Sequence, residues 1–133
     1  MALLKAYPFV IAAIVALDLL WLGVLMKGFY QTRLGHLLAD TVVWPAAIVF
    51  YLVFAVGILV FAVLPGLSAE SLTRTLMLGA LLGVVAYATY DLTNHATLKN
   101  WPVMVTLVDI AWGAVLSALA AGVGWAAASF FTQ

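Results

Sequence analysis

Residues 42–63 read VVWPAAIVFYLVFAVGILVFAV and contain no charged side chain. A helix needs roughly 20 mainly apolar residues to cross the hydrocarbon core of a bilayer, so this stretch is predicted to span a membrane. Three further stretches meet the same requirement, at about 7–27, 72–93 and 102–130. The sequence therefore predicts an all-α polytopic membrane protein, a single domain over residues 1–133 that forms a four-transmembrane-helix bundle.

The composition agrees with a lipid bilayer as the surroundings of the chain. Of the residues, 68% are hydrophobic and 8% are charged, whereas about a quarter of the residues in a soluble domain are charged. Five basic and five acidic residues balance, so no nucleic-acid partner is predicted. The absence of cysteine excludes disulfides, thiolate metal ligands and a thiol nucleophile.

The first apolar run, 9–26, differs from a secretory signal. The hydrophobic region of a signal peptide has roughly 7–15 residues and ends at a small-residue cleavage site. This run is longer, contains Asp18 and continues into Lys27 without such a site. It is therefore predicted to be a retained transmembrane helix.

Capping and turn residues suggest where the helices begin and end. Asp40 is a candidate cap for the second helix, Pro65-Gly66 predicts a tight turn, and Ser68 is a start signal for the third helix. In the long first connection, 28–41, Leu34 and its apolar neighbours Leu37 and Leu38 share one helical face. This pattern suits a short helix on the membrane surface or a plain loop.

Three aspartates, Asp18, Asp91 and Asp109, lie inside or at the edge of the predicted spans. A carboxylate in a bilayer costs several kcal/mol unless it is paired, wetted or protonated, so it marks a functional site by default. At 1.5 Å per helical residue, Asp18 lies about 13 Å before Lys27 and Asp109 about 12 Å after Trp101. We expect one polar cup that opens towards the first and third connections, with Asp91 at its mouth.

Helix faces add neighbours to these acids. Gly79, Gly83, Tyr87 and Asp91 recur every four residues and line one face, whose glycines allow close packing of a second helix. The tryptophans three residues after the other two acids, at positions 21 and 112, share a face with them. The predicted ligand-binding residues are Asp18, Trp21, Tyr87, Tyr90, Asp91, Asn94, Asp109 and Trp112.

Structural roles compete with this interpretation. A membrane aspartate can simply accept a bond from a neighbouring helix, and tryptophans near helix ends are typical of the aromatic belt. His36 and His95 with Asp40 or Asp91 have no metal-ligand spacing, so no metal site is predicted. The sequence indicates neither a cofactor nor a catalytic residue, and whether the chain is an enzyme stays open.

The stretches Tyr90–Asn94, Lys99–Pro102 and Asp109–Gly113 carry a resemblance. With Asp18 and Trp21, they make the whole chain resemble the small bacterial predicted membrane proteins known as domain of unknown function two-one-seven-seven. The resemblance implies a four-helix protein of a bacterial inner membrane. It implies no activity. The small multidrug-resistance transporters are a looser, fold-level comparison, since they also have four helices and an acid in the first.

The leading functional hypothesis is that the acidic, aromatic cup binds a small amphiphile, a lipid headgroup or a cation. The three aspartates would bind the cation or donor, Tyr87 and Asn94 would orient it, and the two tryptophans would stack on it. One alternative is a proton-coupled small-molecule transporter in which Asp18 or Asp109 carries the proton. Others are an accessory subunit, a lipid-modifying enzyme with an aspartate as general acid or base, and a homodimer packed through residues 113–128.

Overall fold

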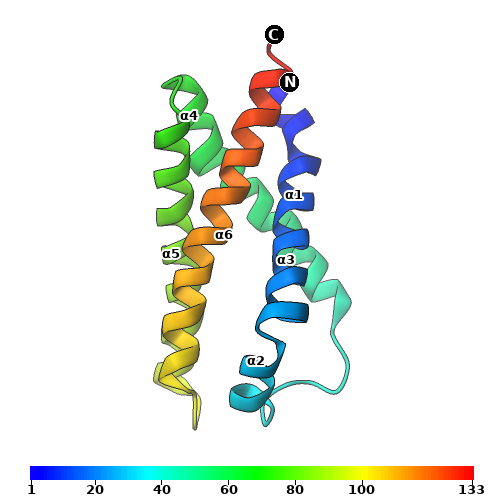
Figure 1. Ribbon diagram of the computed structural model, residues 1–133, viewed down its shortest axis with the longest axis vertical. Helices are drawn as coiled ribbons and strands as arrows, with labels where there is room; N and C mark the ends of the chain where they lie inside the picture. The colour runs from blue at the N-terminus through cyan, green and yellow to red at the C-terminus, as the bar shows by residue number, and fades with distance from the viewer.

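Four helices long and apolar enough to cross a membrane make up most of the computed structural model, which describes residues 1–133. They cover Ala2–Leu25, Trp44–Ser68, Leu72–Thr97 and Val103–Phe130. The protein is therefore an all-α four-helix membrane bundle, as the hydropathy predicts. Both termini lie at one end of the bundle, and α2 lies at the other end with the connection between α5 and α6 (Figure 1).

Two of the four spans contain a π-helical segment, called η1 and η2, that interrupts regular α-helical bonding. In chain order the elements are α1 (Ala2–Leu20), η1 (Trp21–Leu25), α2 (Lys27–Leu34), α3 (Trp44–Ile58), η2 (Leu59–Val63), α4 (Leu64–Ser68), α5 (Leu72–Thr97) and α6 (Val103–Phe130).

The second span does not end at the predicted Pro65-Gly66 turn, because the helix continues through both residues to Ser68. Pro65 comes directly after Leu64, whose N–H makes the last π-type bond, to the Leu59 carbonyl oxygen. Regular α-helical bonding is already interrupted at this point, so the helix tolerates the missing N–H of Pro65. The chain reverses afterwards, and Ser71 caps α5 by accepting a bond of 3.1 Å from the Arg74 N–H. The prediction that Ser68 starts the third helix is therefore wrong.

The first helix and the first connection also differ from the sequence prediction. α1 begins at Ala2 rather than near residue 7, and Pro8 lies inside it, where its missing N–H removes one helical bond. α3 begins at Trp44 with no side-chain cap, so Asp40 does not cap it. The short helix expected in the first connection is α2, and it ends at Leu34, before the exposed Leu37 and Leu38.

α5 and α6 pack more extensively than any other pair of elements, and glycines bring their backbones together. A Cβ atom added to Gly83 would lie 2.0 Å from the Gly113 carbonyl oxygen, and one added to Gly113 would lie 2.4 Å from the Tyr87 ring. This is the small-residue contact that the four-residue spacing predicts. Much of the small-residue run of α6 is buried within this one chain, including Ala120, Ala121 and Ala128.

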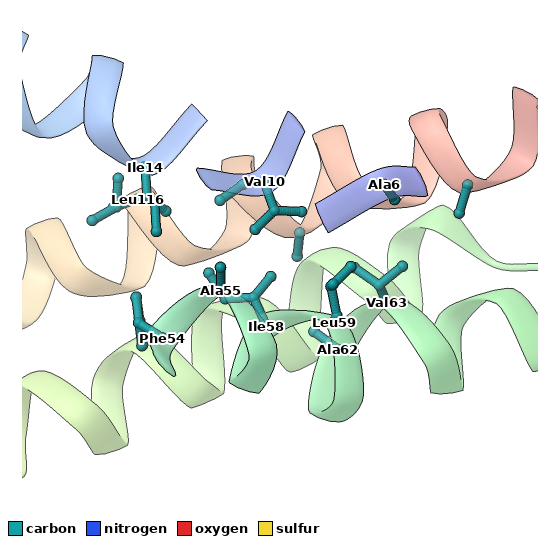
Figure 2. Close-up of a cluster of buried hydrophobic side chains, with 13 residues drawn as sticks. Ala6, Val10, Ile14, Phe54, Ala55, Ile58, Leu59, Ala62, Val63 and Leu116 are labelled. Carbon is teal, nitrogen blue, oxygen red and sulfur yellow. The ribbon is translucent and has the colours of Figure 1, made fainter. Parts of the chain in front are cut away.

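The apolar core lies between α1, α6 and the second span. α1 buries Ala6, Val10, Ile14 and Asp18, which follow one another every four residues and so share one face. Figure 2 shows the first three of them facing the buried side chains of α3 and η2. Because lipid tails are as apolar as these side chains, the core stabilises the bundle by close packing rather than by removal from water.

The position of α3 leaves space inside the bundle for a functional site. It packs against α1, whereas its continuation η2 packs against α5. Figure 1 shows α3 running obliquely behind α1 and α6. The bundle is therefore tightly packed near the termini and less tightly packed near α2, where α3 makes little contact with α5.

Candidate functional site: an acidic aromatic cavity

A cavity of about 550 Å³ lies in the less tightly packed half of the bundle. Side chains from all four spans, from α2 and from the connection before α6 line it, and no lysine or arginine is among them. The lining residues are Asp18, Leu22, Tyr30, Leu34, Phe50, Tyr51, Ala86, Tyr87, Tyr90, Trp101, Asp109 and Trp112.

Asp18 reaches this cavity because it continues the buried face of α1 by one turn. Its side chain is only 5% exposed, and both carboxylate oxygens accept hydrogen bonds. The Tyr51 hydroxyl donates to one oxygen at 2.9 Å, and the Trp112 Nε1 donates to the other at 3.0 Å. Asp18 therefore joins α1 to α3 and α6, and its two oxygens are bonded by neutral donors rather than by a cation.

The two tryptophans stack on each other. The Trp21 and Trp112 rings are 4.3 Å apart and within 3° of parallel. The ring faces that meet are therefore closed to a ligand, which limits the predicted role of these residues as a stacking platform. The Trp112 ring still lines the cavity.

Tyr30 closes the cavity from α2. Its hydroxyl accepts a bond of 3.1 Å from the Trp21 Nε1 and donates to Asp109. Burial, followed by the neighbouring Asp109 carboxylate, raises the pKa of the Tyr30 phenol above its usual value, so the hydroxyl keeps its proton. These two bonds attach α2 to η1 and α6.

Asp91 does not lie at the mouth of the cavity, contrary to the sequence prediction. Its side chain is 0% exposed, because the glycine face of α5 brings it against α6. Neither carboxylate oxygen has a hydrogen-bond donor, and the neighbouring polar group is the carboxyl of Asp109. Asp91 is thus adjacent to the cavity and absent from its lining.

The remaining predicted residues divide between the lining and its surroundings. Tyr87 lines the cavity beside Gly113, and the exposed Tyr90 forms an edge-on contact of 6.1 Å with Trp101. Asn94 is half-buried and outside the lining. The structure therefore brings Asp18, Tyr87, Tyr90, Asp109 and Trp112 together around one space, with Trp21 behind Trp112.

His95 lies in the last turn of α5 and has a structural contact. Thr106 accepts a bond of 3.0 Å from the Trp101 Nε1, and its hydroxyl lies 3.4 Å from His95 Nδ1. This cluster joins the end of α5 to the start of α6. No group of three or more histidine, aspartate or glutamate side chains is placed to hold a metal ion.

The chain matches the model of a known protein family. A family model described as a predicted membrane protein (DUF2177) matches residues 3–126. The chain belongs to the DUF2177 family. No curated protein and no solved structure matches this DUF2177 protein, so its function has to be argued from its own site.

Among the lining residues of the DUF2177 protein that were not predicted, two donate hydrogen bonds to an aspartate. Tyr51 belongs to an aromatic row of α3 that reads as an apolar wall, and Tyr30 lies beyond the predicted end of the first helix. The sequence spacing between each tyrosine and its aspartate could not have predicted the contact, because the two residues are far apart in the chain. The usable signal is chemical, since a buried carboxylate needs donors and tyrosine is a common neutral donor in apolar segments.

Tyr30→Phe in this DUF2177 protein is expected to release α2 from the bundle. The change removes the hydroxyl that donates to Asp109 and accepts from Trp21. A bond to a charged group contributes about 1.5–3 kcal/mol, so the hydrogen-exchange protection of α2 should fall roughly tenfold or more. Tyr7→Phe is the matched control, since the Tyr7 hydroxyl bonds to Leu52 O near the other end of the bundle. Unaltered protection of α2 in Tyr30→Phe would contradict this assignment.

The docking of α2 should also persist at mildly alkaline pH. Because the folded pKa of Tyr30 is raised, the contribution of its hydroxyl is complete below the unfolded value of about 10. It is lost only as the pH rises through the higher folded value. We therefore expect constant protection factors for α2 from neutral pH to about pH 9, measured by hydrogen exchange with correction for intrinsic rates.

Proposed function

We propose that the protein binds an amphiphilic organic cation, with its ammonium head in the acidic aromatic cavity. The proposal rests on the kinds of side chain that line the cavity. Two carboxylates and six aromatic side chains with a polar N–H or O–H group surround a space of about 550 Å³, and no lysine or arginine lines it. Aromatic faces and carboxylates both attract a cation, and the attraction grows when water is excluded.

The hydrogen bonds inside the cavity favour a cation over a hydrogen-bond donor as ligand. Both oxygens of Asp18 are already occupied by Tyr51 and Trp112. A ligand therefore gains from the negative charge of Asp18 more than from a new bond to it. A quaternary ammonium, which carries charge and has no N–H to donate, matches that situation.

An apolar groove next to the cavity supports an amphiphile rather than a small hydrophilic cation. The groove runs along α3, has a volume of about 660 Å³, and shares Phe50 with the cavity. It is lined by Pro45, Ala46, Val49, Phe50, Val53 and Phe54. An alkyl tail could follow this groove into the bilayer while the head stays between α3 and α5.

The test is calorimetric titration of the purified protein in neutral detergent with octyltrimethylammonium. Its neutral carbon isostere, with a tert-butyl head, is the matched ligand. We expect saturable binding of the cation, weakened by about tenfold or more in Asp18→Asn and in Asp109→Asn, because each loses a charge near the head. Asp40→Asn removes an exposed carboxylate of the first connection and should bind like the unmodified protein.

Two results would count against the proposal. One is equal binding of the cation and its neutral isostere. The other is cation binding that survives both aspartate changes in protein whose circular dichroism shows an intact bundle. As the place of action we propose the inner membrane of a bacterium, which the family resemblance implies.

A further inference from the structure

The register of α5 against α6 places two carboxyl groups opposite each other. The helices are antiparallel neighbours, with Gly83 over Gly113 and Ser117, and Tyr87 over Gly113. One turn further along α5 is Asp91, and one turn back along α6 is Asp109. The pair is therefore set by the same glycine contacts that hold the two helices together.

Asp91 has no other partner. It is fully buried, and neither of its oxygens receives a hydrogen bond. His95, one turn along α5, is turned to Thr106. The charged or titratable groups around the pair are Asp18 from α1, Tyr30 from α2, and Tyr87 and Tyr90 from α5. None of these is a cation.

Two ionised carboxylates in this position would repel each other and leave the oxygens of Asp91 without a bond. A single proton between them removes the repulsion and gives one oxygen of Asp91 a bond, because the protonated Asp91 then donates to Asp109. Asp109 also accepts from Tyr30, so it is the member of the pair better suited to carry the negative charge.

We infer that Asp91 and Asp109 share one proton, and that a cation entering the cavity beside Asp109 displaces it to solvent. The O–H bond of Asp91 breaks and the proton passes to water, while the positive charge of the ligand takes its place. Charge is conserved, one cation for one proton. The displacement step rests on the proposed cation binding, whereas the shared proton does not.

The shared proton is tested first by infrared spectroscopy of the protein without ligand at neutral pH. We expect the C=O stretch of a protonated carboxylic acid, shifted by deuteration and absent in Asp91→Asn. An asparagine keeps the size of Asp91 and can donate its N–H to Asp109, so the variant should fold. Asp18→Asn and Asp40→Asn should keep the band. If the unmodified protein lacks the band, or if Asp91→Asn retains it, the inference is wrong.

The displacement is tested by titrating octyltrimethylammonium in buffers with different ionisation enthalpies, which counts the protons released. We expect one proton per bound cation in the unmodified protein. Asp91→Asn should release none and bind at least as tightly, because no proton has to leave the pair before the cation binds. Binding without proton release would overturn the displacement and leave the proposed function intact. Absence of binding would overturn the proposed function and the displacement together, and the infrared band would still decide the shared proton.

Discussion

Gly83→Ala is expected to lower the free energy of unfolding of the bundle by about 3 kcal/mol, the upper part of the usual range for overpacking. The added Cβ would lie 2.0 Å from the Gly113 carbonyl oxygen and 2.7 Å from the Ser117 Oγ. The first of these is a backbone atom in the interface between α5 and α6, so relief requires the two helices to move apart. The measurement is unfolding in mixed micelles with increasing sodium dodecyl sulfate, followed by far-ultraviolet circular dichroism.

Gly57→Ala is the matched control for this prediction. Gly57 also lies inside a spanning helix, but a Cβ added there meets nothing within 4 Å. Because alanine favours a helix over glycine by about 1 kcal/mol in soluble hosts, this change should be neutral or mildly stabilising. If Gly83→Ala unfolded like Gly57→Ala, the close backbone contact of α5 with α6 would be refuted.

Asp18→Leu is the second change with a large expected effect. It leaves the Tyr51 hydroxyl and the Trp112 N–H without their acceptor. An unsatisfied buried donor costs about 1–3 kcal/mol, so the loss of stability should reach about 2–5 kcal/mol for the two. Because Trp112 loses the bond of its N–H group, its ring should also shift relative to the Trp21 ring. The near-ultraviolet circular dichroism signal of the stacked pair should therefore weaken.

Asp18→Asn separates the loss of charge from the loss of hydrogen bonds. The amide oxygen can still accept from one donor, so this variant should retain more stability and more of the tryptophan signal than Asp18→Leu. Equal stability of the leucine variant and the unmodified protein would show that the two bonds contribute nothing net. That result is known for some buried polar groups replaced by apolar residues of similar volume.

The fold was predictable because its determinants are local. A run of apolar residues long enough to cross the bilayer must form a helix there, since lipid offers no partner for free backbone groups. The four-residue spacing of Gly79, Gly83 and Asp91 likewise identifies the face of α5 that packs on α6. Local rules failed at the connections, where Ser68 and Asp40 are good caps by residue type but the helices begin elsewhere.

The candidate site was predictable only in part. Helix faces and depths indicate that Asp18 and Asp109 belong to one half of the bundle, and both line the cavity. The burial of Asp91 was missed, because distance from the helix end measures depth in the membrane and not enclosure by a neighbouring helix. The pairing of tryptophans 21 and 112 was missed as well, since stacking depends on how two distant helices are rotated against each other.

The amino-acid pattern alone was sufficient to establish a membrane bundle of four helices with carboxylates in its apolar segments, because hydropathy and helical period act along the chain. Only the tertiary structure shows the contacts between residues that are far apart in the chain. Tyr30 and Tyr51 donate to acids far away in sequence, and the oblique course of α3 leaves a cavity beside them. Asp91 faces Asp109 rather than water. These contacts depend on helix register and crossing, which are set by the packing of all four helices together.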